Sequence, residues 1–497
     1  RHWQDIFPLM KKRYLFSGVE NFLLYDLWQD GHVNENVFAY SNGAGSERTL
    51  VFYNNKYDQA YGWIKQSDPY AVKTGNGDEI SLVTRSISEG LNLTAEDDKY
   101  CIFRENRSGL WFIRKSSEIC EKGMFVMLNG FEYQVYMDIH QVTDEADNRY
   151  KILCEFLNGK GCEDIETAWQ ELIYADLYKA AETFAEKVFT PLSSCLQEEK
   201  KISAKIVKSI LDDSKDSALD FYEIALKTAK EETGGSKSSK IKTQDCYKKF
   251  AERFKKYIAV HNAAAPKKPA DLQKALVKAK TAESYAKLLC TENKNLETAI
   301  LAWSCVSVLA ENGMACKWNL GRKFSQYVKE YKISENKVRP LFTKLFLLAT
   351  ATDSSSISTA KGAKDAAYKI VDLLCNSKYC GLLSGANCFD NIWWFNKETI
   401  EESLSLISMI MSLGSKAKDL PAVFKLSKTV NKAKLEAAYK CELLVKKFAP
   451  KVVKTKAKTK ANAKTKSAAK TKAKSAGKEK SATKATTKKT TASKTKK

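Results

Sequence analysis

Two short acidic segments hold the residues whose types and spacing come nearest to an acid–base pair. Residues 96–98 read EDD, and residues 144–147 read DEAD. Two carboxylates can cleave a glycosidic bond with retention of configuration when they lie about 5–5.5 Å apart across the sugar. Both segments stand in polar stretches that are typical of solvent-exposed loops. We therefore interpret them as solvated loop charge and predict no catalytic residue among them.

Histidine and cysteine are the other residue types that serve catalysis or bind metal ions. The four His lie far apart and form neither an HExxH motif nor the setting of a catalytic triad. The 13 Cys occur singly, and the nearest group, Cys375, Cys380 and Cys388, lacks the spacing of a zinc knuckle. We expect reduced, mostly buried thiols in a cytoplasmic protein. The sequence has no GxxxxGK[ST] phosphate loop, and we predict no cofactor and no metal site.

Aromatic residues are frequent between positions 53 and 136, and an exposed ring can stack on the apolar face of a sugar. Trp63 and Trp111 are the candidate glycan contacts in this stretch. Packing in a core or against a neighbouring domain is the alternative explanation for most of these rings. The run Trp393-Trp394-Phe395 precedes a predicted helix, and we interpret it as a hydrophobic anchor in preference to a ligand site.

The C-terminal segment 449–497 carries most of the net positive charge of the chain. It holds 18 Lys and a single Glu, and so supplies 17 of the 23 net charges of the chain. The segment has no aromatic residue and no apolar period, which predicts disorder. Lysines that neutralise phosphates release condensed counterions, so Lys454, Lys456, Lys458 and Lys460 are candidate contacts for nucleic acid or another polyanion. A role limited to solubility is the alternative.

The elements that must position these residues include a series of strands. Residues 33–142 contain short runs in which apolar and polar residues alternate, with turn signals between them. Two runs flank the loop Asn106-Arg107-Ser108-Gly109 and predict a hairpin. Asn129-Gly130 predicts a second hairpin through a type I′ turn, after which every second residue from Phe131 to Ile139 falls on one face. These strands predict an antiparallel β-sandwich.

The other elements have a helical pattern. Residues 1–30 are predicted to be helical, with Pro8 near a helix start and a break at Ser17-Gly18. From Asp164 onward, apolar residues recur at helical spacing, beginning with a stripe from Trp169 to Ala180. No run of 18 apolar residues occurs, so we predict no membrane-spanning helix and no membrane partner.

Several stretches of the chain, taken together, resemble a known family. They are KRYLF (12–16), VENFLLYDLW (19–28), GHVNENVFAYSN (31–42), RTLVFYNNKY (48–57), YCIFRENRSGLWFIRKSSEICEKGMFVMLNGFEYQVYMDI (100–139), LNGKG (157–161) and WWFNKE (393–398). The first six, over about residues 1–165, resemble the segment that follows the catalytic barrel in large bacterial α-amylase-family proteins, glycoside hydrolase family 13. The last resembles the helical C-terminal part of the same proteins.

The resemblance implies that a catalytic (β/α)₈ barrel lies upstream in the same polypeptide, with an antiparallel β-sandwich packed behind it. Family members use an Asp nucleophile, a Glu acid/base and a second Asp on barrel strands. No position of this sequence matches those motifs. The resemblance therefore implies a noncatalytic C-terminal part of an enzyme that acts on α-glucans, inactive when alone. The alternative is a polyanion-associated or nucleic-acid-associated scaffold that keeps an amylase-like module and uses its Lys-rich tail.

The predicted fold class is multidomain, with an amylase-type β-sandwich, a mostly α-helical region and a disordered Lys/Ala-rich tail. The predicted boundaries are 1–30 for a helical remnant of the preceding barrel, 31–150 for the β-sandwich, 151–233 for a helical region, 234–243 for a linker, 244–448 for a helical domain and 449–497 for the basic tail.

Overall fold

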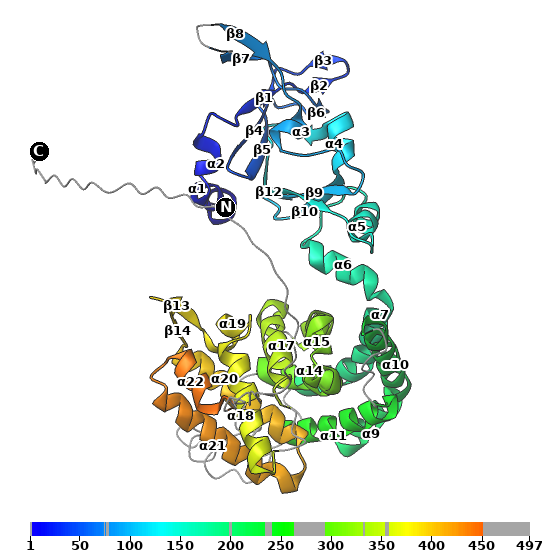
Figure 1. Cartoon of the computed structure of the whole chain (residues 1–497). Coiled ribbons are helices and arrows are strands. Elements are labelled where there is room, and N and C mark those ends of the chain that lie inside the picture. The colour runs from blue at the N-terminus through cyan, green and yellow to red at the C-terminus, as the bar shows by residue number, and fades with distance from the viewer. Residues whose placement is uncertain are drawn as a thin grey trace, which may run out of the picture. The chain divides into compact units, whose positions relative to one another are not determined.

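The computed structural model describes residues 2–73, 75, 79–197, 201–233, 241–262, 294–331, 333–352 and 357–450. Most of the predicted linker and nearly all of the basic tail, including its four candidate lysines, lie outside the described residues. Figure 1 shows antiparallel strands in the first third of the chain and helices after them. This order agrees with the predicted succession of strands and helices.

The chain begins with η1 (His2–Ile6), α1 (Phe7–Lys11) and α2 (Tyr14–Ser17). Pro8 occupies the first turn of α1, as predicted, and the helices end before Gly18, which is extended. The prediction of helix through residue 30 is wrong, because Leu23–Tyr25 pairs with another strand as β1. Backbone hydrogen bonding to that neighbour overrides the local helical pattern.

All strand pairs in the described part of the chain are antiparallel, in two larger sheets and two small ladders. The six-stranded sheet consists, in spatial order, of β1, β4 (Val37–Ala44), β5 (Glu47–Asn54), β12 (Tyr133–Thr143), β9 (Lys99–Glu105) and β10 (Trp111–Lys115). The four-stranded sheet consists of β11 (Met124–Leu128), β6 (Ala60–Ile64), β2 (Trp28–Gln29) and β3 (His32–Val33). The ladders are β7 (Tyr70–Lys73) with β8 (Ile80–Val83) and β13 (Asn387–Phe389) with β14 (Ile392–Trp394).

The two larger sheets share one buried core. Leu50 and Phe52 enter it from the six-stranded sheet, and Ile64 and Val126 enter it from the four-stranded sheet. Two short helices, α3 (Ile87–Gly90) and α4 (Ser116–Lys122), add Ile87 and Ile119 to the same core.

The structure confirms one predicted hairpin and corrects the other. Strands β9 and β10 pair across the loop at 106–109, as expected. Strands β11 and β12, which flank Asn129-Gly130, do not pair with each other, because β11 joins β6 and β12 joins β5 and β9. A Cβ on Gly130 would lie 2.0 Å from the Tyr57 carbonyl oxygen, so this glycine allows a close backbone approach as the chain crosses between sheets. The positive φ of this connection falls on Phe131.

Strand β12 is half-buried as predicted, but its alternation is interrupted. Val135, Met137 and Ile139 are all buried. The pairing register with β9 shifts between Met137 and His140, which marks a bulge. Tyr136, before the bulge, and Ile139, after it, therefore both contact the shared core. The single face predicted from Phe131 to Ile139 is thus divided at the bulge.

Helices α5 (Arg149–Leu157) and α6 (Ile165–Ile173) accompany a second, smaller core beside β9 and β10. Leu153 and Leu157 of α5 bury against Tyr100 and Ile113 of these strands. The apolar stripe that begins at Trp169 does not belong to one helix, since the chain changes direction between α6 and α7 at residue 174.

The helical region has one large core that runs from Tyr174 to Phe448. Residues on both sides of the predicted linker contribute to it. Its helices are α7 (Ala175–Phe189), η2 (Thr190–Leu192), α8 (Ser193–Gln197), α9 (Ala204–Asp213), α10 (Lys215–Glu232), α11 (Thr243–Asn262), α14 (Lys294–Glu311), α15 (Met314–Lys317), α16 (Leu320–Ser325), η3 (Gln326–Tyr331), α17 (Glu335–Ala349), α18 (Ala360–Cys375), α19 (Cys380–Ser384), α20 (Lys397–Gly414), η4 (Ala417–Asp419), α21 (Leu420–Glu436) and α22 (Cys441–Phe448). Among the described residues, we find no helix with the length and apolar character needed to cross a bilayer.

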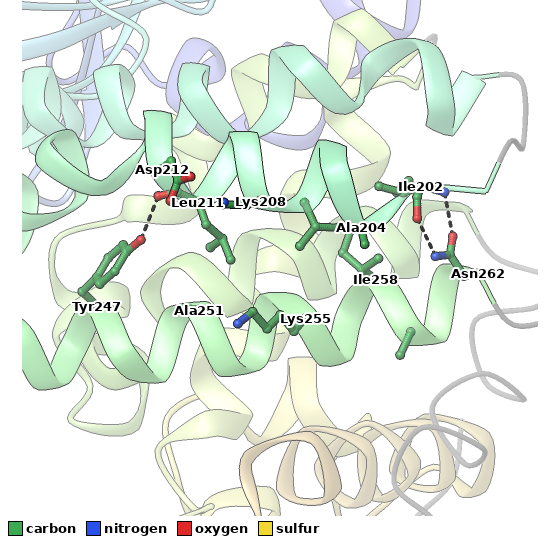
Figure 2. A pocket seen from close by; sticks show the side chains of 12 residues that line it. Ile202, Ala204, Lys208, Leu211, Asp212, Tyr247, Ala251, Lys255, Ile258 and Asn262 are labelled. Atoms are coloured by element: carbon green, nitrogen blue, oxygen red, sulfur yellow. Dashed lines mark hydrogen bonds between the residues drawn. The ribbon is translucent and has the colours of Figure 1, made fainter.

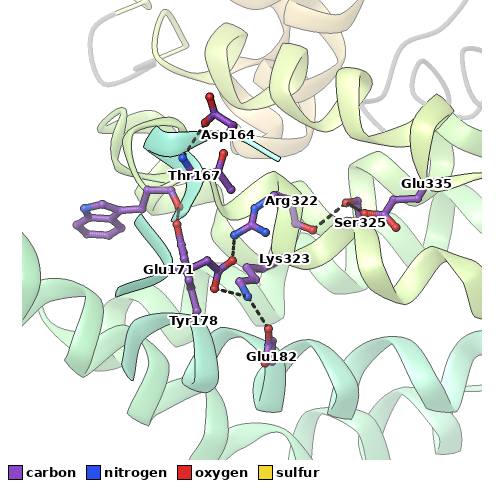
Figure 3. A network of polar contacts seen from close by, with 10 residues as sticks. Asp164, Thr167, Glu171, Tyr178, Glu182, Arg322, Lys323, Ser325 and Glu335 are labelled. Carbon is purple, nitrogen blue, oxygen red and sulfur yellow. Dashed lines mark hydrogen bonds and ion pairs between the residues drawn. The ribbon is translucent and has the colours of Figure 1, made fainter. Parts of the chain in front are cut away.

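A polar network joins α6 to α7 and α16 (Figure 3). The Lys323 ammonium lies 3.0 Å from Glu171 Oε2 and 2.9 Å from Glu182 Oε1, and it also sits 4.8 Å from the ring centroid of Tyr178. Arg322 forms a further ion pair with Glu171. The Lys323 side chain is only 9% exposed, so its charge depends on these partners. The network therefore fixes α16 against α6 and α7.

The aromatic run Trp393-Trp394-Phe395, which precedes α20, is partly buried and partly exposed at the surface. Phe395 is buried, in agreement with its interpretation as a hydrophobic anchor. Trp394 is half-buried and lies 5.1 Å beneath the Lys440 ammonium. Trp393 is 43% exposed and lies at the surface. Asn396 begins α20 by accepting a hydrogen bond from the Thr399 backbone N–H.

Candidate functional site

A row of exposed aromatic side chains crosses the outer face of the four-stranded sheet. Trp63 on β6 is in register with Phe125 on β11 at one side and with Trp28 on β2 at the other. Residues directly opposite each other on neighbouring strands project from the same face. The three side chains are 42–54% exposed, and the rings of Trp63 and Phe125 lie 5.5 Å apart at 64°. We call Phe125, Trp63 and Trp28 the aromatic row.

The aromatic row arises because strands β6 and β11 have apolar residues at both their inward and their outward positions. In AYGWI and MFVML the inward residues are small or aliphatic and buried, as expected for a strand over a core. The outward positions of these strands, which normally hold polar residues, are also apolar or aromatic. Tyr61 and Met127 form a second exposed pair beside the row, and Tyr61 Oη donates to Asp30 Oδ2 at 2.9 Å.

Gly62 allows β2 to approach β6 closely. A Cβ added to Gly62 would lie 2.2 Å from the carbonyl oxygen and 2.8 Å from the carbonyl carbon of Trp28. Only glycine avoids this contact with the backbone. Gly62 therefore helps to hold Trp28 beside Trp63.

A pocket of about 240 Å³ opens at the end of the aromatic row. Trp63 and Phe125 line it together with Arg114 and Glu118. The Arg114 guanidinium donates to the Gly159 carbonyl at 3.0 Å and to its neighbouring Ile113 carbonyl at 3.3 Å. The pocket thus combines aromatic walls with one cationic donor group and one carboxylate, the mixture that binds small polar molecules with apolar faces.

The two sequence-predicted tryptophans do not form one site. Trp63 is the centre of the aromatic row, whereas Trp111 lies on β10 of the other sheet. Trp111 is half-buried beside the smaller core, its backbone pairs with Cys162, and Arg104 lies 5.9 Å from its ring centroid. These contacts account for Trp111 as a packing residue. Sequence reasoning missed Trp28 and Phe125, for which the aromatic outward positions of their strands were the available signal.

The two acidic segments come together in space but act as structural charges. The Asp144 N–H donates to the Asp98 carbonyl at 2.7 Å. The Asp144 carboxylate then accepts from the backbone N–H groups of residues 150 and 151 and so caps α5. Hydrogen bonds from Lys99 and Thr94 lower the pKa of Glu96 to about 2. A general acid needs a raised pKa, so this carboxylate is unsuited to that role.

The N-terminal helices present a second apolar surface. Leu15 is buried, and the Lys12 ammonium lies 2.5 Å from Asp138 and 3.3 Å from Glu47, which fixes α1 and α2 on the six-stranded sheet. The other side of these helices remains open to solvent. Its exposed apolar residues, which we call the N-terminal face, are Trp3, Ile6, Phe7 and Met10. Tyr14 is also exposed, but its hydroxyl donates to Glu47 Oε1 of the sheet at 2.8 Å.

A groove of about 650 Å³ lies between α9 and α11 (Figure 2). Tyr247 donates to the Leu211 carbonyl at 2.8 Å near one end, and Asn262 exchanges two hydrogen bonds with Ile202 at the other. Aliphatic side chains form most of its lining, with Lys208 among the polar residues. This lining suits an apolar ligand and differs from the aromatic row.

In the described ranges, we detect no cluster of three or more His, Cys, Asp or Glu side chains that could hold a metal ion.

In the comparisons with known proteins, no family model, no curated protein and no solved structure matches this chain. We therefore infer function from the surfaces described above.

Proposed function

We propose that this chain is the noncatalytic C-terminal part of an α-amylase-like glycoside hydrolase that acts on α-glucans. In this proposal, the two sheets over residues 23–143 are the amylase-type β-sandwich. The helices η1, α1 and α2 connect it to a catalytic (β/α)₈ barrel that precedes it in the same polypeptide. The observation that carries the proposal is the N-terminal face, a group of exposed apolar side chains on the helices that would follow the barrel.

The N-terminal face belongs to helices that cannot be stable on their own. Each has only four or five residues, well below the roughly 12–15 residues at which isolated helices become even marginally stable. Contacts of Leu15 and Lys12 hold one side on the sheet. Apolar surface of this kind, left on the other side, marks an interaction site. A barrel packed there would bury Trp3 and Met10, which are exposed at present.

The carboxylates of the described residues are consistent with a noncatalytic role for this chain, and the thiols are consistent with a cytoplasmic protein. The best-placed acidic cluster is occupied by lysine partners and a helix cap, so we assign bond cleavage to the barrel. The cysteines that the structure describes are free thiols. Free thiols fit the reducing cytoplasm, which we propose as the location of the protein.

The first test reads the encoding gene in the 5′ direction. We expect an open reading frame that continues into a barrel with Asp, Glu and Asp at strand ends. We also expect purified 1–497 to release no reducing sugar from starch or maltooligosaccharides, and the extended protein to do so. A reading frame without a barrel would contradict the proposal and favour a polyanion-associated scaffold that depends on the Lys-rich segment.

The second test examines the N-terminal face in the extended protein. Trp3→Ser with Met10→Ser should lower its melting temperature, because the barrel contact loses apolar area, and should leave the melting temperature of 1–497 nearly unchanged. Tyr57→Ser, at a residue that is also strongly exposed, is the matched control. Equal effects of the two changes in the extended protein would contradict the docking role of this face.

A further inference from the structure

We propose that the aromatic row is a binding surface for a neutral, curved glucan chain, with the adjoining pocket for one terminal sugar unit. Trp63 is its central contact, and Phe125 and Trp28 flank it. The choice of an α-glucan as the ligand rests on the proposed function. The surface itself follows from the register, exposure and charge of the residues on the four-stranded sheet.

Folding alone does not explain the aromatic row. The inward residues of β6 and β11 already supply the shared core, with Ile64, Val126 and Leu128 fully buried. The outward rings of Trp63 and Phe125 instead keep about half of their surface in water. Exposed apolar area is unfavourable by roughly 25 cal/mol per Å², so three such rings in register on neighbouring strands indicate a ligand or partner.

The charge of this face indicates a neutral ligand. Charged residues make up 28% of the chain, yet neither β6 nor β11 contains one, and β2 contains only Trp28 and Gln29. A polyanion would require Lys or Arg side chains along the face. The nearest charges are Asp30, which accepts a hydrogen bond from Tyr61, and Arg114 and Glu118 in the pocket. A neutral polymer with alternating apolar faces and hydroxyl edges, such as a glucan, therefore meets no charged side chain from β6, β11 or β2.

The ring geometry favours a curved chain over a flat one. The planes of Trp63 and Phe125 are inclined by 64°, so the two rings cannot both lie against one flat ribbon. Inclined rings can contact successive sugar units of a chain that turns, as α-linked glucans do. The Tyr61 hydroxyl, which donates to Asp30 at 2.9 Å, lies beside the row and offers a polar edge for sugar hydroxyls.

The pocket supplies polar groups at one end of the row. Trp63 and Phe125 line both features, so a chain that stacks on the row would direct its terminal unit toward Arg114 and Glu118. The Arg114 guanidinium is already oriented by two backbone carbonyls. A donor and an acceptor in one small pocket match the hydroxyls of a single sugar unit. At about 240 Å³ the pocket lies just below the range of roughly 300–1,000 Å³ for drug-sized ligands.

The row is held in place before any ligand binds. Its central strand, β6, is paired on both sides, with β11 and with β2. Gly62 lets the β2 backbone approach closely, so the spacing of Trp28 and Trp63 is set by the sheet. Binding would therefore require no rearrangement of the backbone that carries these side chains.

The experiment is affinity electrophoresis of the full chain in gels that contain amylose, with tryptophan fluorescence titration of maltoheptaose. We expect both glucans to bind. Trp63→Ala should weaken binding at least tenfold, whereas Trp63→Phe, which keeps a ring, should retain most of it. Trp393→Ala is the matched control, because Trp393 is 43% exposed against 42% for Trp63, and it should bind like the wild type.

The outcomes separate this inference from the proposed function. Failure of the wild-type chain to bind amylose, or equal losses in Trp63→Ala and Trp393→Ala, would overturn the inference even if the gene encodes a barrel. Cellohexaose is the flat, β-linked comparison, and binding as tight as that of maltoheptaose would overturn the preference for a curved α-glucan. Amylose binding that depends on Trp63 would support the inference even if the reading frame contains no barrel.

Discussion

Glu232, the last residue of α10, accepts hydrogen bonds from the C-terminal end of α15 and from the junction between α6 and α7. Tyr174 Oη donates to its carboxylate at 2.6 Å, Trp318 Nε1 at 3.1 Å and Lys317 Nζ at 2.7 Å. Burial alone would raise the pKa of Glu232, but the hydrogen bonds from Lys317, Tyr174 and Trp318 outweigh burial and lower the pKa below its ordinary value of 4.5. Folding therefore stabilises the charged carboxylate.

The lowered pKa of Glu232 predicts how stability depends on pH. A carboxyl whose pKa is lower in the folded than in the unfolded state stabilises the fold above its unfolded pKa. That contribution is lost as the pH falls through the lower, folded pKa. Glu232→Gln should destabilise the helical region at pH 7 by about 1–3 kcal/mol, and the difference from wild type should shrink below about pH 4.

Urea unfolding at pH 7, 5, 4 and 3, followed by helical circular dichroism, measures this difference. Glu231→Gln changes an exposed neighbour in the same helix and is the control. Parallel stability curves for the two variants across this pH range would show that the Glu232 hydrogen bonds contribute nothing specific.

For the strands and helices, the sequence pattern predicted where the elements lie along the chain better than it predicted which strands pair with each other. The runs at β9 and β10 alternate and flank a short polar loop, and they do pair. The runs at β11 and β12 look alike but enter different sheets, and Gly130 between them packs against the Tyr57 carbonyl, far away in the sequence. A local pattern contains no information about such a contact.

The same limit applies to the aromatic row. Trp63 could be identified from sequence as an aromatic residue in a strand region. Its two neighbours are aromatic residues too, but their position beside Trp63 depends on the register of three strands, which a local pattern does not reveal. Trp28 even lies in a stretch whose apolar spacing predicts helix. The N-terminal helices were predictable as far as Ser17, where Gly18 ends the helical pattern.

Gly62→Ala tests the close approach of β2 and β6. The added Cβ would meet backbone atoms of Trp28, which can retreat only if β2 separates from β6. We expect a loss of about 1–3 kcal/mol in stability and a change in near-ultraviolet circular dichroism, since Trp28 would move relative to Trp63. Gly18→Ala is the control, because a Cβ added there would have nothing within 4 Å and the φ of Gly18 is −80°. Equal melting temperatures for the two variants would refute this role of Gly62.

For the molecule as a whole, the packed cores and most of the net positive charge occupy different parts of the sequence. The buried cores of the described residues end with Phe448 in α22. The segment that follows contributes 17 of the 23 net positive charges through 18 Lys and one Glu. This separation was visible from composition alone, because a stretch without apolar residues at regular spacing cannot supply a core. We therefore predict that the stability of the chain and its binding to a polyanion can be changed independently.

Deletion of 449–497 tests that independence. The full chain should bind double-stranded DNA with an affinity that falls steeply with salt, at a log–log slope of roughly −0.9 per phosphate contacted, and equally on two unrelated duplexes, because Lys–phosphate contacts do not read bases. The truncated chain should not bind, and its melting temperature should match that of the full chain, since the described cores lie before residue 449. Replacing Lys454, Lys456, Lys458 and Lys460 by Ser should weaken the slope by up to roughly 0.9 per Lys. If the truncated chain binds DNA as well as the full chain, the positive charges responsible lie in the helical region. If neither chain binds DNA at low salt, the segment 449–497 has no polyanion-binding role and serves solubility.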